Sequence, residues 1–171
     1  MKKSSRGFSL IELLIVVAII LIIAAIAIPN LLRSRIAANQ ASAVGSLRTL
    51  NTAEVTYATT YNTGYSSTLG DLGPNAAGQT PVATAAGLVD EVLSGSAAAQ
   101  SAATTSAKSG YQFVYTPGAT DTNGRTNTYQ ITATPVSVGT TGTNFYYTDQ
   151  SGVIRQNSTN VASSSDSPLA G

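Results

Sequence analysis

Two hydrophobic patterns follow one another in the first third of the chain. The residues from Phe8 to Ile28 are apolar except for Ser9 and Glu12, and a helix of that length spans about 31 Å, the thickness of a bilayer core. Beyond Pro29, apolar residues recur at the spacing of one helix face. These residues are Leu32, Ile36, Ala43, Leu47, Leu50, Tyr57 and Tyr61. We predict one helix over residues 8–61, membrane-spanning in its first half and amphipathic in its second.

In the second half of the chain the hydrophobic period changes from 3.6 to 2. Apolar and polar residues alternate over 111–115 and 129–133, and shorter runs begin at Phe145 and Val153. Turns rich in Asp, Asn and Gly connect them. We therefore predict an α+β fold, in which the long helix packs on a small antiparallel sheet of about four strands.

The remaining segments carry weaker patterns. Residues 62–84 contain several Gly and Pro breakers and predict a loop, whereas residues 88–93 predict a short helix closed by Gly95. The tail from Gln156 is rich in Ser and Asn and predicts a mobile segment. The expected organisation is a leader over 1–7, a transmembrane or filament-core helix over 8–28, an amphipathic helix over 29–61 and a globular head over 62–171.

Glu12 is an acidic residue inside the apolar run, and it changes the interpretation of that run. A carboxylate in hydrocarbon costs on the order of a few kcal/mol, so an intramembrane acid indicates a function by default. No residue inside the run supplies a cation. Cutting the chain after Gly7 would create one, because the new amino group on Phe8 is positive at neutral pH. We expect Glu12 to pair with such an amine.

The residues Gly7-Phe8-Ser9-Leu10-Ile11-Glu12-Leu13, preceded by Lys2, Lys3 and Arg6, resemble the class III signal of type IV prepilins and pseudopilins. The resemblance implies that a prepilin peptidase and methyltransferase cuts between Gly7 and Phe8 and N-methylates Phe8. It also implies that Glu12 helps to dock each subunit into a helical filament. Pro29 stands where many members of the family carry a proline. Beyond about Tyr61 the resemblance is one of architecture only.

Two other interpretations of the N-terminus remain open. An ordinary secretory signal peptide also begins with basic residues and an apolar run, but its apolar core has about 7–15 residues. A plain signal anchor would have the observed length and would leave Glu12 unexplained. Pro29 lacks an N–H, so we expect a kink or local opening of the helix at that position.

Composition excludes several classes of function. The sequence has no cysteine and no histidine, so a disulfide-closed head, a His-based triad and an imidazole zinc site cannot be built. Without the three leader cations, six basic side chains stand against eight acidic ones, a net charge of about −2. The head shows no basic stripe, so we expect no nucleic-acid binding. We find no enzyme active site and expect no cofactor.

The head contains weak candidates for a metal site and for a modification. Asp121, Asn123 and the following Gly124 resemble part of a calcium loop, and Asp149 has a similar setting. A hairpin turn is the favoured explanation of both, and the remaining ligands of an EF-hand are missing. Asn157-Ser158-Thr159 fits the N-glycosylation sequon, in a tail that needs no sugar to be explained.

The resemblance implies that this chain is a structural subunit of a filament. The prepilin would sit in the bacterial inner membrane, interact with a pilus or secretion assembly platform, and join copies of itself in an extracellular fimbrium that serves motility or adhesion. One alternative is a pseudopilin of a type II secretion system. A membrane-anchored binding module is another, in which the helix only tethers the head.

Overall fold

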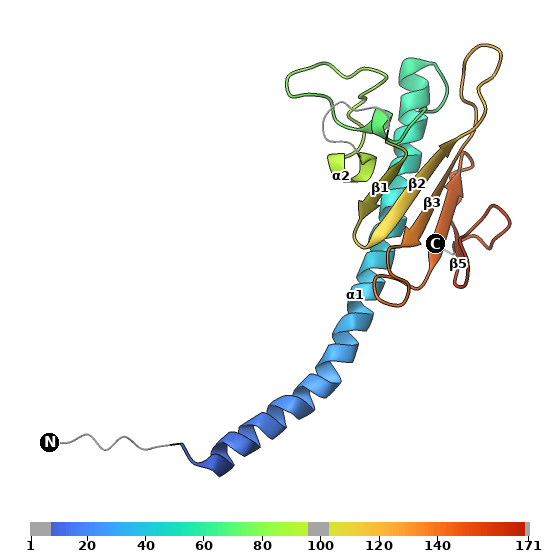
Figure 1. Cartoon of the computed structure of the whole chain (residues 1–171). Helices are drawn as coiled ribbons and strands as arrows, with labels where there is room; N and C mark the ends of the chain where they lie inside the picture. The colour runs from blue at the N-terminus through green and yellow to red at the C-terminus, as the bar shows by residue number, and fades with distance from the viewer. Residues whose placement is uncertain (1–7, 96–102, 170–171) are drawn as a thin grey trace. The chain divides into compact units, whose positions relative to one another are not determined.

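A computed structural model describes residues 8–95 and 103–169, and Figure 1 shows its helices and strands. The predicted leader, residues 1–7, lies outside the described residues. The chain divides into two compact units, residues 1–35 and residues 36–171. The second unit combines helix and antiparallel sheet, which confirms the predicted α+β class.

Helix α1 covers Leu10–Tyr61, within the predicted range of 8–61. Pro29 lies inside this helix and does not end it. A proline leaves the carbonyl four residues earlier without its N–H donor. Other partners and small local adjustments can satisfy that carbonyl, so a proline inside an apolar helix is tolerated. The kink or local opening at Pro29 therefore stays a prediction.

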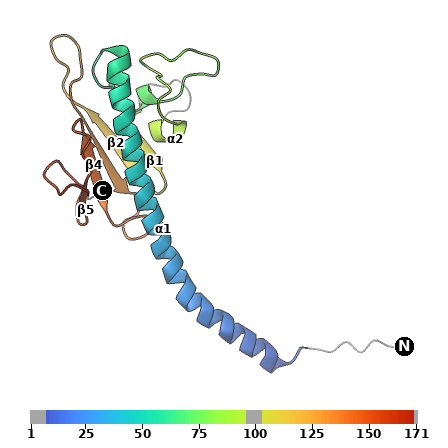
Figure 2. The same cartoon turned by 180° about the vertical axis from the view of Figure 1, so that it is seen from behind.

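Within the second unit, one face of α1 packs against the sheet, as the two opposite views in Figures 1 and 2 agree. The buried residues of α1 are Ala43, Ser46, Leu47, Leu50, Ala53, Glu54 and Tyr57. Four of them belong to the predicted apolar stripe. Toward the ends of that stripe, Ile36 and Tyr61 are half-buried and Leu32 is exposed.

The sheet has five strands in the order β1-β2-β3-β4-β5, and every neighbouring pair is antiparallel. Each strand thus pairs with the next along the chain, so the sheet is an antiparallel meander. The strands are β1 Thr105–Lys108, β2 Tyr111–Pro117, β3 Tyr129–Pro135, β4 Phe145–Asp149 and β5 Arg155–Asn157.

Alternation along the strands places the aromatic residues on the helix side. Tyr111, Phe113 and Tyr115 of β2 are buried, and Gln112 between them is exposed. These rings pack with the buried face of α1 in one apolar core. Burial of an aromatic side chain contributes about 1.5–3 kcal/mol. Packing of this kind holds together a head that has no cysteine.

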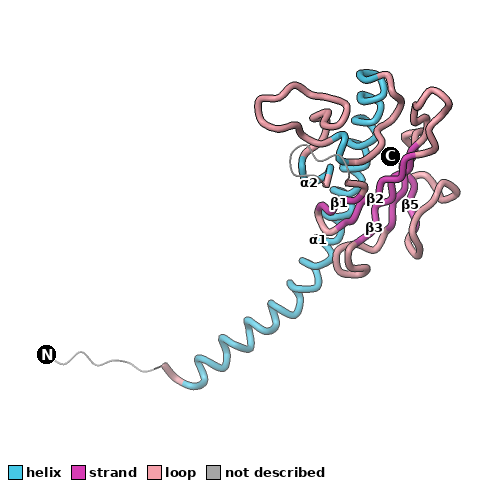
Figure 3. The backbone as a smooth tube through the Cα atoms, turned by 45° about the horizontal axis from the view of Figure 1, so that its top comes forward, coloured by secondary structure: helices cyan, strands magenta, loops and turns pink. Residues whose placement is uncertain are grey.

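Two short elements were not predicted, and two others are shifted. β1 lies where the Ala, Ser and Thr-rich sequence gave no prediction, and the 3-10 helix Gly70–Leu72 lies in the predicted loop. The predicted short helix is present as α2, Glu91–Ser94, between its N-cap Asp90 and Gly95. β5 begins two residues later than the run at Val153. Figure 3 shows the loops that join these elements.

The C-terminal tail differs from the mobile segment expected after Gln156. The N–H of Gln156 donates to the carbonyl of Ser167, and the N–H of Leu169 donates to that of Ile154. Ala162 is buried. The tail is therefore folded against the last strand up to Leu169, and backbone pairing of this kind leaves no signal in the composition.

Candidate functional site

The carboxylate of Glu12 has a partner within its own chain. Its Oε2 accepts a hydrogen bond of 2.9 Å from the backbone N–H of Ser9, at the start of α1. A glutamate that reaches back to the N–H three residues earlier forms half of a capping box and satisfies a free donor of the helix start. The Ser-x-x-Glu spacing was the signal for this contact, which the sequence prediction did not use. No described residue donates to Oε1.

The apolar side chains around Glu12 are exposed. Phe8 and Leu10 each expose 80% of their surface, and the large apolar residues up to Ile28 are exposed as well. Among the described residues, α1 is the one helix that is long and apolar enough to cross a membrane. A surface of this extent is stable only in lipid or against another protein.

The predicted processing and assembly residues lie along α1 and do not form a cluster. Gly7 falls outside the described residues, and Phe8 precedes the helix by two positions. Glu12 and Pro29 are separated by about 25 Å at 1.5 Å per residue. The site is thus a helix surface with a carboxylate near one end.

A second acid of α1, Glu54, is fully buried in the head, and the sequence analysis did not identify it. Its Oε2 accepts from the N–H of Ser66 at 2.9 Å, and its Oε1 accepts from the Ser66 hydroxyl at 2.6 Å. The Tyr115 hydroxyl donates to the Ser66 carbonyl at 2.7 Å. This network fastens the segment after α1 to both the helix and β2.

The surroundings of Glu54 contain acids and phenols. Burial raises the pKa of the Glu54 carboxyl above its ordinary value, and the nearby Asp71 carboxylate raises it further, against the bonds from Ser66. Burial also raises the pKa of Asp71. No described residue forms an ion pair with Glu54. Two hydrogen bonds from Ser66 therefore hold a carboxyl group whose neutral form is favoured by its environment.

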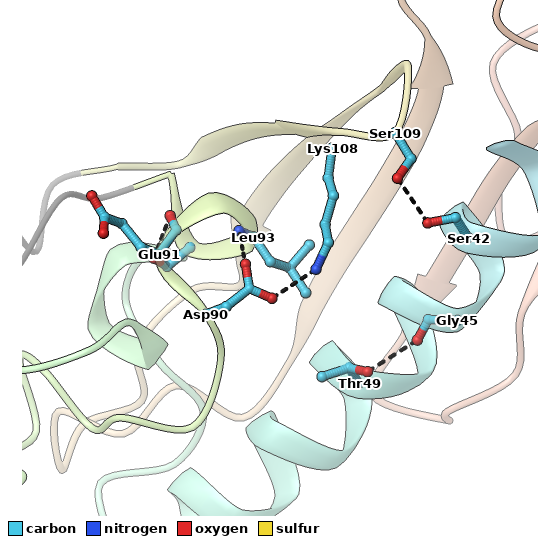
Figure 4. Close-up of polar contacts among 9 residues, drawn as sticks. Ser42, Gly45, Thr49, Asp90, Glu91, Leu93, Lys108 and Ser109 are labelled. Atoms are coloured by element: carbon cyan, nitrogen blue, oxygen red, sulfur yellow. Dashed lines mark hydrogen bonds and ion pairs between the residues drawn. The ribbon is translucent and has the colours of Figure 1, made fainter.

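Figure 4 shows the polar contacts that fix the β1–β2 hairpin. Asp90 accepts from the Leu93 N–H as the N-cap of α2, and its other oxygen pairs with the Lys108 ammonium at 2.7 Å. The hydroxyl of Ser42 donates to that of Ser109 at 2.9 Å, which joins the hairpin to α1. These contacts position the head, and exposed pairs of this type contribute about 0–1 kcal/mol each.

Comparison with known proteins concerns mainly the N-terminal region. The family model described as "Prokaryotic N-terminal methylation motif" matches residues 2–28. The chain is 51% identical over 53 residues to the type IV major pilin protein PilA of Myxococcus xanthus, 31% of this chain and 24% of that protein. It is 62% identical over 37 residues to the type IV wide pilus major component PilA4 of Thermus thermophilus, 22% of this chain and 28% of that protein.

The N-terminal region of this chain is thus similar to that of type IV major pilins and carries the prokaryotic N-terminal methylation motif. The match covers about a quarter of the length of these relatives. No solved structure matches the chain significantly. The head is therefore described from its own structure.

The calcium candidates of the head are engaged in turns. Oδ1 of Asp121 accepts from the N–H groups of Asn123 and Arg125, and Oδ2 accepts from the side-chain amide of Asn127. These donors, the Arg125 N–H first, lower the pKa of Asp121. Asp149 caps its own turn by accepting from the Ser151 N–H. The geometry is that of two turns, and the described residues gather no group of three acidic or similar metal ligands.

The glycosylation candidate Asn157 lies in β5 of the head. Its side-chain amide nitrogen donates to Asp166 at 2.9 Å, and its oxygen accepts from the Thr159 and Asn160 N–H groups. A sugar would have to be attached to the nitrogen that makes the first of these bonds. Asn157 is thus a structural link to the tail in the folded head.

Proposed function

We propose that this chain is the structural subunit of a type IV pilus. The observation that carries the proposal is an exposed apolar helix with an acid at its start, directly after the junction that the methylation motif covers. The names of the two relatives, a major pilin and a wide pilus major component, favour a pilus over a secretion pseudopilus.

Processing is the first step of the proposed function. A prepilin peptidase and methyltransferase cuts between Gly7 and Phe8 in the inner membrane and methylates the amino group of Phe8. The new amine is positive and lies in the same apolar surroundings as Glu12. The cut therefore creates the cation that the acid lacks.

Assembly is the second step. The amine of Phe8 in one subunit donates charge-assisted hydrogen bonds to Glu12 of a neighbour. Another stagger of the helices would leave a buried charge unpaired, at a cost of several kcal/mol, so the pair sets the register. The apolar residues up to Ile28 leave lipid and pack against one another, on an assembly platform of the pilus type. The resulting extracellular filament serves motility or adhesion.

An intact mass measured on protein sheared from the cell surface tests this function. A mass that starts at methylated Phe8, abundant in the sheared fraction, is the expected result. A processed chain that stays in the cell envelope would favour a pseudopilin of a type II secretion system. An unprocessed chain in the envelope would favour a membrane-anchored binding module.

A further inference from the structure

A pocket of about 430 Å³ lies on the outer face of the sheet, within the second unit. Its lining includes Thr116 of β2, Gln130 of β3, and Tyr147 and Asp149 of β4. α1 covers the opposite face of the sheet (Figure 2). Within the second unit, the pocket and α1 thus lie on opposite faces of the sheet.

The strand register builds the floor of this pocket. Thr116 pairs with Gln130, and Gln130 pairs with Asp149, so these three residues form one row across three strands. Paired residues on neighbouring strands place their side chains on the same face, about 5 Å apart. A hydroxyl, an amide and a carboxylate thus stand next to one another on the outer face.

Two segments form the walls. Ser164 of the folded tail lines one side, and Pro117 at the end of β2 and the following Gly118 line another. A Cβ added at Gly118 would lie 1.8 Å from the Thr128 hydroxyl, so the backbone approaches closely at this wall. Tyr147 exposes 8% of its surface and closes the floor. The pocket exists because the tail is folded, a feature that was not predicted.

The polar groups of the pocket are available to a ligand. Among the described residues, none forms a hydrogen bond with the side chains of Thr116, Gln130 or Gln150. Oδ2 of Asp149 has a single distant donor, the Tyr147 hydroxyl at 3.4 Å. Its volume lies within the range of small-molecule sites, and its lining is mainly polar.

The charge and the group types limit the class of ligand. Asp149 is the single charged residue of the lining, so a phosphate, sulfate or carboxylate ligand would be repelled. Amides and hydroxyls both donate and accept, which matches adjacent hydroxyl groups on a ring. The Pro117 ring and the small exposed part of the Tyr147 ring, which both line the pocket, suit the C–H face of such a ring. We propose that the pocket binds a neutral sugar unit of a glycan.

The test uses the full chain in micelles of a detergent without a sugar headgroup, so that the detergent does not compete with the probes. Binding in a single head does not require filament formation, so the result is independent of the proposed assembly. Saturation-transfer NMR is measured with N-acetylglucosamine, methyl glucoside and methyl galactoside as probes. Gln130→Ala removes an amide from the floor, and Asp149→Asn keeps the turn while removing the carboxylate. Gln112→Ala is the matched control, since Gln112 is exposed on β2 and does not line the pocket.

We expect transfer to at least one sugar, with affinity about three- to tenfold lower in Gln130→Ala and in Asp149→Asn, as for the loss of one hydrogen bond. Gln112→Ala should bind like the original chain. The proposal is overturned if a correctly folded chain gives no transfer to any of the three sugars. It is also overturned if Gln130→Ala and Asp149→Asn bind the sugars as tightly as the control does.

Discussion

At the scale of single residues, Glu12 and Glu54 show how one helix uses the same side chain in two settings. Glu12 stands in an exposed apolar surface and accepts a donor from its own helix start. Glu54 is enclosed in the head and is satisfied by Ser66. The first carboxylate keeps a free oxygen, whereas the second has none. The two residues should therefore respond differently to replacement.

Replacing Glu12 should affect assembly and leave the subunit intact. In Glu12→Ala, the amine of a neighbouring Phe8 would be buried without a partner, at a cost of about 3–5 kcal/mol per contact. We expect processed subunit at a normal level in the membrane and at least about a tenfold loss of sheared filaments. Immunoblots of both fractions measure this, with Glu91→Gln as the control. A normal filament yield from Glu12→Ala would contradict the proposed pairing of Glu12 with the Phe8 amine of a neighbour.

Replacing Glu54 should change how head stability depends on pH. Burial raises the pKa of Glu54 in the folded state, so its neutral form is preferred there. Its contribution is fully present below the unfolded pKa of about 4.3 and is lost as pH rises through the folded pKa. In Glu54→Gln this loss is absent. The free energy of unfolding of the original chain should therefore fall more steeply with rising pH than that of the variant.

Urea unfolding, followed by circular dichroism at several pH values, provides the measurement. The difference between the two chains is the useful quantity, because Asp71 shifts in the same direction and remains in both. Asp90, Asp121 and Asp166 have lowered pKa values and act in the opposite direction in both. Equal slopes for the two chains would contradict the burial of an ionisable Glu54.

At the scale of elements, α1 contains a glycine that its surroundings do not require. Nothing lies within 4 Å of a Cβ built at Gly45. Glycine in a helix interior costs about 0.5–1 kcal/mol relative to alanine. Gly45→Ala should therefore stabilise the head by about that amount in urea unfolding. Gly118→Ala is the contrasting variant, and it should destabilise because of the Thr128 contact. A destabilised Gly45→Ala would mean that α1 needs its flexibility here.

The elements also differ in how far the sequence could predict them. The helix and the strands with tyrosines and phenylalanines follow from periodicity, because each carries enough buried apolar residues to mark a face. β1 has the sequence Thr-Ser-Ala-Lys and no such face, and its strand form depends on pairing with β2. Glu54 lies on the apolar stripe between Leu50 and Tyr57, which are seven positions apart. A search for apolar periodicity counts apolar residues alone, so it does not identify a buried polar residue on the same face.

At the scale of the whole molecule, the N-terminal region could be predicted in more detail than the head. The N-terminal region carries a short sequence motif, whereas the structure of the head depends on contacts between residues that are distant in the sequence. Asn51 of α1 donates to Thr148 of β4, 97 positions away, and no local pattern announces such a pair. The folded tail depends on the same kind of contact.

Removing the tail tests its role in the molecule. A chain that ends at Asn157 loses buried Ala162 and the packing of Leu169 against the core. Uncovering apolar surface of this size should cost about 1–3 kcal/mol of the free energy of unfolding. Urea unfolding measures the loss, and Ser158→Ala, which keeps the tail, is the control. Unchanged stability after truncation would show that the tail is not held by the head.

The bond from Ser9 to Glu12 has a consequence for the proposed addition of subunits. A carboxylate has two oxygens, and here one of them is engaged with its own helix. In the proposed filament, the amine of an incoming subunit would bind the other oxygen before the Ser9 contact is broken. The carboxylate would then keep at least one hydrogen-bond donor at every stage of subunit addition.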